Sequence, residues 1–184
     1  ELPDDQHDPA RCAFDRLVRQ RRRGVEQRLG ANGDPADLHE LVHGVAERRW
    51  DDVIRLYGER THVEHPFDPL GAPPLRTRDD LREHFKPGTT AEPDIRRRPG
   101  NITIHDTTDP EVIVAEFEYQ GTVGDSGEPF SVPCIFVLRV RNGEIIASRD
   151  YIDHLGSARV RGQFDELIAA IKATSTISAD PADH

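Results

Sequence analysis

A turn and a charged strand are encoded together in the stretch GEIIASRDYIDH, residues 143–154. The isoleucines favour a β-strand, and the preceding Asn142-Gly143 dipeptide is typical of a turn that joins two paired strands. Alternation along the strand places every second side chain on one face, namely Ser148, Asp150, Ile152 and His154. Because an unpaired carboxylate is costly to bury, Asp150 predicts a polar partner or a cavity beside this strand. We therefore take Asp150 as the first candidate for chemistry.

The composition predicts a single soluble domain with a core of its own. The chain has 184 residues, of which 35% are hydrophobic and 32% are charged. Its net charge of -10 argues against nucleic acid or an anionic membrane as the main partner. No apolar run approaches the ~20 residues that a transmembrane helix requires. Only Cys12 and Cys134 are present, so we expect no disulfide framework and a cytoplasmic location.

Helical patterns dominate the first half of the chain. Residues 1–33 are polar and rich in arginine, and they predict an appended helical extension. A helix is expected after the capping residue Asp34, with an inward stripe of Leu38, Leu41, Val42 and Val45. Shorter helices are expected at about 51–57 and 78–85, the second of them capped by Thr77. The prolines between these two helices exclude regular structure there.

Period-two patterns follow after Pro87. Strands are expected near residues 94–98, 101–106, 111–122, 130–141 and 144–154. A last helix is expected over 164–173, and residues 174–184 predict a disordered tail. Helices followed by a run of antiparallel strands indicate one α+β domain over residues 34–173, in which a curved antiparallel sheet wraps around the N-terminal helices.

Two groups of motifs resemble the SnoaL-like and ketosteroid isomerase-like proteins of the nuclear transport factor 2-like fold. The first group is VEHPF at 63–67 with RDDLREHF at 78–85. The second is AEFEY at 115–119, GEPF at 127–130 and the stretch at 143–153. The resemblance covers roughly residues 34–160 and implies a cone-shaped, cystatin-like barrel that encloses a pocket. Isomerases, cyclases, epoxide hydrolases, dehydratases and pure binding proteins all use this fold, so it implies no single reaction.

The resemblance to the isomerases places a histidine at their catalytic position. Their proton-accepting carboxylate lies in a Val-Glu-Asp-Pro segment, and His65 stands at that position here. Histidine can accept a proton near neutral pH, because its ordinary pKa is about 6.5. The tyrosine with which these isomerases stabilise an enolate matches Leu41, so the resemblance does not carry that group over.

The resemblance to limonene epoxide hydrolase places its catalytic aspartate on Asp150. Its arginine then falls on Glu116 and its other aspartate on Glu118, so the charge at the first of these positions is reversed. Strand alternation alone turns both glutamates to solvent, opposite Phe117 and Tyr119. The resemblance implies instead that the glutamates line the pocket, where burial would raise the pKa of one of them. Both orientations remain open at this point.

A literal zinc-protease motif, H-E-x-x-H, occurs at residues 39–43. It falls on the first expected helix, but His39 and His43 lie beside the apolar stripe, and no Gly-x-x-His continuation follows. We interpret it as a polar flank of the helix, and we expect neither a metal ion nor a cofactor.

These observations predict a pocket for a small, apolar ligand. The expected catalytic residues are His65, Asp150, Glu118 and Glu116, and the expected substrate-binding residues are Val63, Val132, Cys134, Phe136, Tyr57 and His154. The leading hypothesis is a cofactor-free isomerase or cyclase that acts on a polyketide- or terpenoid-like substrate, with His65 as base and Asp150 orienting it or serving as acid. An epoxide-opening enzyme of the limonene epoxide hydrolase type and a non-catalytic binding domain are the alternatives. A homodimer is expected, with contacts on the opposite strand face at Arg149, Tyr151 and Asp153.

Overall fold

The structure is a computed structural model that describes residues 35–86, 94–105, 107–124 and 126–177. The extension expected over residues 1–33 lies outside this part. The first elements of the described chain are, in order, α2 (Pro35–Ala46), α3 (Trp50–Arg55), β1 (Arg60–Glu64), β2 (Leu75–Thr77), α4 (Arg78–His84) and β3 (Ile95–His105). The remaining elements are β4 (Val112–Val123), β5 (Glu128–Arg141), β6 (Glu144–Ile152), α5 (His154–Val160) and α6 (Phe164–Ile177). The α+β class expected from the pattern is confirmed.

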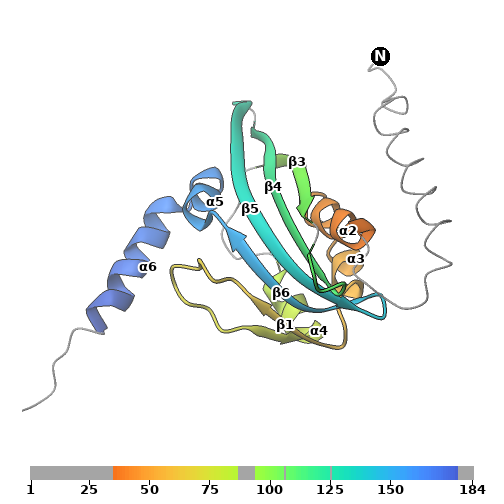
Figure 1. Ribbon diagram of the computed structural model, residues 1–184. Coiled ribbons are helices and arrows are strands. Elements are labelled where there is room, and N and C mark those ends of the chain that lie inside the picture. Colours follow the sequence, from red (N-terminus) through yellow and green to blue (C-terminus); the bar gives the residue numbers. More distant parts are fainter. Residues whose placement is uncertain (1–34, 87–93, 106, 125, 178–184) are drawn as a thin grey trace, which may run out of the picture. The chain divides into compact units, whose positions relative to one another are not determined.

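One six-stranded sheet organises the domain, in the order β2-β1-β6-β5-β4-β3. Figure 1 shows the long strands β3, β4 and β5 curving together, with α2 and α3 on one side of them. All neighbours are antiparallel except β1 and β6, which pair in parallel with Val63 opposite Ser148. The curved sheet is thus antiparallel as expected except at this one pairing, because β1 comes from a segment distant in sequence and is not bound by hairpin geometry.

The two strands expected on either side of Pro99-Gly100 form the single strand β3. This strand stands at the edge of the sheet, where a residue without an amide hydrogen is tolerated. The register shifts between Gly100 and Thr103, and Asn101 takes a positive φ of 53°. The irregularity is therefore a bulge within one strand and not a break between two.

Local capping signals set the helix boundaries. Thr77 and Asp80 form a capping box at the start of α4, as the sequence suggested for Thr77. The last strand ends at Ile152 instead of continuing to residue 154, because Asp153 accepts a hydrogen bond from the amide of Gly156 and starts α5. Helix α6 continues to Ile177, so the predicted start of the disordered tail at residue 174 is too early in the chain. No helix in the described part of the chain is long and apolar enough to cross a bilayer.

The core lies between α2 and the inner face of the sheet. Leu38, Leu41 and Val42 of α2 are at most 1% exposed, as the helical stripe predicted. The inner face of β4 is formed by alternate residues, namely Ile113, Ala115, Phe117 and Tyr119. Because α2 contacts β3 and β4, it covers one side of the space that the curved sheet encloses.

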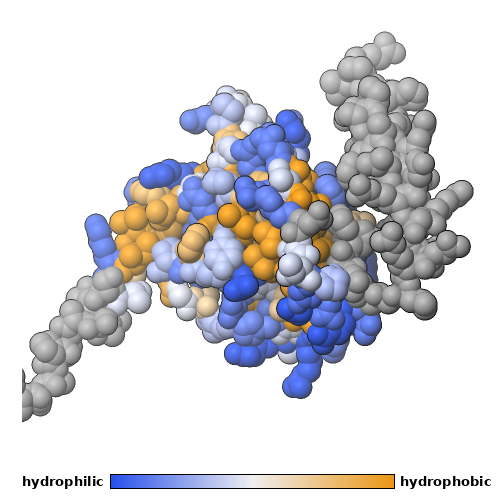
Figure 2. Space-filling view, in the orientation of Figure 1, coloured by the Kyte–Doolittle hydropathy of each residue, from blue (hydrophilic) through white to orange (hydrophobic). Residues whose placement is uncertain are grey.

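The outer surface carries a small apolar cluster. Ile135 and Tyr151 are opposite each other on β5 and β6, and the ring of Phe67 packs against that of Tyr151 at 5.2 Å. Phe67 and Ile135 are 67% and 43% exposed. In Figure 2 most of the visible surface is hydrophilic, and hydrophobic surface appears in separate patches. The homodimer expected at this face stays a prediction.

Removing a core side chain from α2 tests this packing. Leu38→Ala should lower the free energy of unfolding by about 2–5 kcal/mol, because Leu38 is fully buried and the cavity cannot close around the smaller side chain. The matched control is Leu70→Ala in a loop, where the side chain is 44% exposed and the change should stay within about 0.5 kcal/mol. Urea unfolding followed by circular dichroism measures both, and equal losses would contradict the position of the core.

Candidate active site

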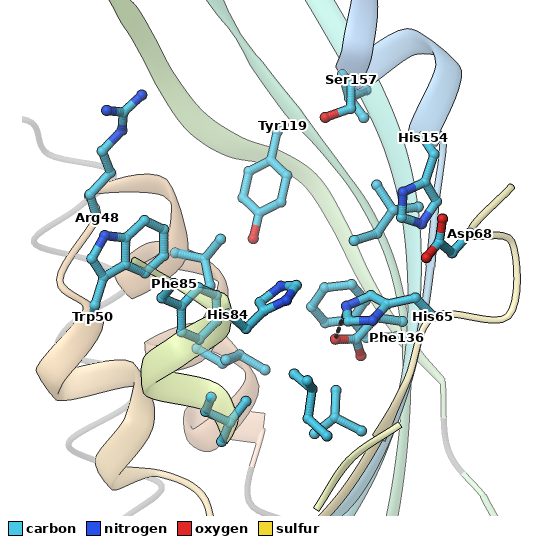
Figure 3. Close-up of a pocket in the computed structure, with 18 of the residues that line it drawn as sticks. Arg48, Trp50, His65, Asp68, His84, Phe85, Tyr119, Phe136, His154 and Ser157 are labelled. Atoms are coloured by element: carbon cyan, nitrogen blue, oxygen red, sulfur yellow. Dashed lines mark ion pairs between the residues drawn. The ribbon is translucent and has the colours of Figure 1, made fainter. Parts of the chain in front are cut away.

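A cavity of about 640 Å³ lies within the domain, on the inner side of the sheet. Its apolar wall includes Leu41, Trp50, Phe85, Phe130, Val132 and Phe136. Its polar wall includes His65, Asp68, His84, Tyr119, Asp150 and His154. Figure 3 shows His84 on one side of the space and His65, Asp68 and His154 on the other. An apolar cavity with a few convergent polar groups is the usual form of a small-molecule site.

Asp150 is the only carboxyl group buried in this cavity wall among the described residues. It points inward from β6, as alternation predicted, and is 6% exposed. The hydroxyl of Ser148, on the same face of the strand, donates a hydrogen bond to Asp150 Oδ1. Burial raises the pKa of Asp150 to about 7, although the hydrogen bond from Ser148 opposes the rise. Both ionisation states are therefore populated near neutral pH, as a proton-transferring group requires.

His65 reaches Asp150 because β1 pairs in parallel with β6. Val63 lies opposite Ser148 in this pairing, and His65 follows the end of β1. Its Nε2 lies 4.0 Å from Asp150 Oδ2, a contact drawn as the dashed line in Figure 3. Burial is the largest of the effects that lower the pKa of His65 to about 4, followed by the charges of His84 and His154.

The proton of this pair resides on the carboxyl group. The 4.0 Å spacing by itself would permit an ion pair, but it is too long for a hydrogen bond. The pKa of Asp150, about 7, lies above that of His65, about 4, so His65 remains neutral while Asp150 titrates. We favour the neutral imidazole because desolvation, which opposes both charged forms, is the dominant effect on both groups. Asp150 is therefore the group of this pair that titrates near neutral pH, while the role expected for His65 as the base stays a prediction.

Three imidazole rings gather beside Asp150. His84 stacks on His65 with ring centroids 5.3 Å apart, and His154 meets His65 edge-on at 6.1 Å. The side chain of His84 lines the cavity, and it therefore keeps solvent-accessible surface although protein atoms surround much of its ring. Burial is the main cause that lowers the pKa of both His84 and His154. The described residues contain no group of three or more His, Cys, Asp or Glu placed to hold a metal ion.

Tyr119 supplies a hydroxyl that the sequence interpretation assigned to the core. Its side chain is 6% exposed, and its hydroxyl is buried without a hydrogen-bond partner. Figure 3 shows this hydroxyl pointing into the cavity. Burial raises the pKa of Tyr119, so the group keeps its proton and can donate a hydrogen bond. A buried hydroxyl without an acceptor costs about 1–3 kcal/mol, which an oxygen of a ligand would recover.

Five of the six residues expected to bind the substrate line the cavity. These are Val63, Tyr57, Val132, Phe136 and His154. Cys134 is buried on β5 but lines a separate, shallower pocket, and burial raises its pKa to about 12.

Glu116 and Glu118 do not line the cavity, so the orientation implied by the resemblance was wrong for them. Glu116 is exposed and bonds His105 at 3.0 Å, while Glu118 accepts hydrogen bonds from Asn101, Gln120 and Ser131 on the outer side of the sheet. The physical reason is the one that alternation gave: Phe117 and Tyr119 occupy the buried face of β4. Of the residues aligned with the epoxide hydrolase triad, only Asp150 lies in the cavity.

Residues 38–148 match the SnoaL-like domain family. The chain belongs to the SnoaL-like family. An uncharacterised PhzA/B-like protein from Pseudomonas aeruginosa is 30% identical over 115 residues, which cover 62% of this chain and 77% of that protein. An uncharacterised Bacillus subtilis protein, YesE, is 24% identical, with the same coverage.

Solved structures share the fold at low sequence identity. A Bacillus subtilis protein described as a candidate isomerase has a TM-score of 0.59 and 22% identity, covering 70% of this chain and 91% of that one. A Catenulispora acidiphila protein with a ketosteroid isomerase-like fold, solved with trimethylamine, has a TM-score of 0.54 and 18% identity, covering 71% and 95%. A candidate polyketide cyclase from Pseudomonas putida has a TM-score of 0.51 and 13% identity, covering 68% and 95%. This SnoaL-like protein therefore has the nuclear transport factor 2-like fold.

The two buried groups make opposite contributions to stability as the pH changes. The folded state raises the pKa of Asp150 from 3.8 to about 7, so its contribution is complete below about pH 4 and is lost as the pH rises through 7. The folded state lowers the pKa of His65 from 6.5 to about 4, so its contribution is present above pH 6.5 and is lost as the pH falls through 4.

Asp150→Asn should remove the first contribution and leave the second. Relative to wild type, the free energy of unfolding of the variant should therefore improve by about 4 kcal/mol between pH 4 and pH 7.5. Urea unfolding at a series of pH values measures this difference, with Asp165→Asn as the same substitution at an exposed side chain. A difference between variant and wild type that stays constant with pH would show that Asp150 is not held protonated by burial.

Proposed function

We propose that this SnoaL-like protein transfers a proton within a small, largely apolar carbonyl compound, as an isomerase or cyclase that uses no cofactor. The observation that carries the proposal is the buried Asp150 carboxyl group, whose pKa of about 7 lets it accept and return a proton near neutral pH. It lies in a cavity whose wall combines apolar side chains with a few convergent polar groups.

Asp150 is the proposed base and then the acid. Its carboxylate takes a proton from the carbon next to the carbonyl group, so that a C–H bond breaks and an O–H bond forms on Asp150. The electron pair of the broken bond moves toward the carbonyl oxygen, and an enolate results. Where a C=C bond adjoins that carbon, the enolate is a dienolate, and return of the proton from Asp150 to its far carbon gives the isomer. For ring closure, the enolate carbon bonds to a second carbonyl carbon of the substrate, the π bond of that carbonyl group breaks, and Asp150 returns its proton to the resulting alkoxide oxygen. No oxidant or metal ion enters this sequence.

Tyr119 is the proposed donor to the enolate oxygen. Its unpartnered hydroxyl points into the cavity, and a donor that is fixed before reaction stabilises developing negative charge without reorganisation. This assignment supplies from β4 the function that the related isomerases place on their first helix, where this chain has Leu41. Neutral His65 packs beside Asp150 and is proposed to keep its carboxyl group desolvated.

The relatives support the class of reaction and not its details. The fold is shared with proteins described as a candidate isomerase and a candidate polyketide cyclase, both at identities below 25%. The epoxide-opening alternative has less support, because Glu116 and Glu118 lie outside the cavity. A pure binding domain remains the competing function that the experiment must distinguish.

Deuterium exchange tests proton transfer without knowledge of the natural substrate. In D₂O, the wild-type protein should accelerate replacement of the α-hydrogens of 2-decalone, a bicyclic apolar ketone, as followed by proton NMR. Asp150→Asn should lower this rate by about 10²–10⁴-fold, because the base is removed. Tyr119→Phe should lower it by about 10²-fold, because the enolate oxygen loses its donor.

Glu116→Gln is the control, since it removes a carboxylate from the same sheet on the outer side. Its rate should equal that of wild type. The wild-type rate should also rise with pH and level off above about pH 7, where Asp150 is ionised. Exchange that is unchanged in Asp150→Asn would refute the assignment of the base, and binding of the ketone with no exchange would favour the binding domain.

A further inference from the structure

The cavity wall carries an excess of positive charge, although the chain has a net charge of -10. Its cationic lining residues are Arg48, Lys86, Arg97 and Arg161, and its carboxylates are Asp68 and Asp150. Asp68 accepts backbone hydrogen bonds from Leu70 and Ala72, each at 3.0 Å. Asp150 is protonated for part of the time, because burial raises its pKa to about 7. The four cations therefore outnumber the two carboxylates of the wall.

Three of the four cations are engaged by other groups of the protein. Lys86 pairs with Glu83 on α4. Arg97 donates to the backbone carbonyl of Val45 at 2.7 Å, and its guanidinium group lies over the ring of Tyr119. Arg48 is exposed and also has an interaction partner.

Arg161 is different from these three. It follows the last turn of α5, and its Nε is buried without a hydrogen-bond partner. No carboxylate in the described part of the chain forms an ion pair with it. After burial, its charge is among the causes that lower the pKa of His84 and of His154. The charge of Arg161 therefore acts on the imidazoles that line the cavity.

Carboxylates also act on these imidazoles, since Asp68 opposes the effect of Arg161 on both His84 and His154. Asp68 and Asp153 act on His154 in the opposite direction to Arg161. Both carboxylates accept hydrogen bonds from backbone amides and form no ion pair with Arg161. Asp68 accepts from the amides of Leu70 and Ala72, and Asp153 accepts from the amide of Gly156 at the start of α5. A carboxylate from outside the protein would complete the hydrogen bonding of Arg161, since a guanidinium group presents paired donors that match carboxylate geometry.

We infer that the ligand of this cavity is a small organic acid, whose carboxylate binds Arg161 while its apolar skeleton contacts the aromatic wall at Trp50 and Phe136. The acidic group is then held near α5, and the rest of the molecule extends toward Asp150 and Tyr119. Because the site is the one assigned above to proton transfer, this choice of substrate class rests on the proposed function.

A single tryptophan makes the test direct. Trp50 is the only tryptophan of the chain, and it lines the cavity, stacked on Phe85 at 4.6 Å. Its fluorescence should therefore report binding of adamantane-1-carboxylate and of adamantane-1-carboxamide, two transparent probes of nearly equal shape. We expect wild type to bind the carboxylate at least about tenfold more tightly than the amide at pH 7.5 and low salt. Equal binding, tighter binding of the amide, or no binding of either probe at 10 mM would overturn the inference.

Two variants locate the preference. Arg161→Gln should bring the two dissociation constants within about twofold of each other, because the guanidinium group is lost. Arg149→Gln removes an exposed arginine from the outer face of β6 and should keep the wild-type preference. A preference that survives in Arg161→Gln would assign the acid to another cation and overturn the inference.

A measurement on the wild-type protein covers the case in which Arg161→Gln does not fold. A carboxylate bound at Arg161 should raise the pKa of His84 and His154, because it offsets the charge that lowers them. Histidine NMR titration with the carboxylate probe should show this rise, and the amide should not. Tight binding of the carboxylate without a change at either histidine would also overturn the inference.

Binding and turnover separate this inference from the proposed function. A protein that prefers the carboxylate through Arg161 but does not exchange the α-hydrogens of 2-decalone keeps the anion site and loses the proton-transfer function. A protein that exchanges them through Asp150 but binds both adamantane probes equally keeps the function and loses the substrate class.

Discussion

The parallel pairing of β1 with β6 is the constraint on which the site depends. It joins the segment that follows the helices to the centre of a sheet that is otherwise built from hairpins, with Val63 opposite Ser148. This pairing brings His65 next to Asp150, although their strands are far apart in the sequence. Thr61 and Ile145, which are joined by a hydrogen bond, are 84 residues apart. It also directs the loop that carries Asp68 to the wall of the cavity. Without it, the curved sheet would have an inner face but no closed pocket.

Burial, more than pairing, sets the chemistry of this pocket. Asp150 and His65 could form an ion pair, but desolvation favours the uncharged form of each. It raises the pKa of Asp150 and lowers that of His65. The carboxyl group therefore titrates in the physiological range while the imidazole does not. A histidine that looks like the natural base by its ordinary pKa becomes a neutral neighbour, and the proposed base is the aspartate.

The polar groups that the fold leaves without hydrogen-bond partners indicate which chemical groups the cavity would bind. The hydroxyl of Tyr119 and the Nε of Arg161 are buried without partners and belong to residues that line the same cavity. One is a neutral donor and the other a cationic donor, so both favour oxygen atoms that accept hydrogen bonds. A carbonyl group and a carboxylate on one apolar skeleton would satisfy both. The proposed reaction and the proposed substrate class therefore follow from the same buried donors.

Local patterns predicted most of the helices and strands and the inward face of the last strand, but not β1, β2 or α5. The apolar stripe of α2, the cap at Thr77 and the alternation that turns Asp150 inward depend on neighbours within a few residues, so the sequence states them directly. The same alternation correctly turned Glu116 and Glu118 outward, whereas the resemblance did not. The bulge that makes β3 one strand was missed, because a proline on an edge strand looks like a break until the sheet order is known.

Only the tertiary structure decided which polar groups meet. Alternation placed Tyr119 on the apolar face of its strand, and no role was expected for His84, because nothing local shows that each faces a cavity. The order of the pKa values of Asp150 and His65 also depends on burial, which is the sum of contacts from elements far apart in the chain. The sequence by itself thus determined the fold class and one carboxyl group of the site. The tertiary structure decided which side chains surround that carboxyl group and how far its pKa shifts, because desolvation and distance are properties of the folded chain.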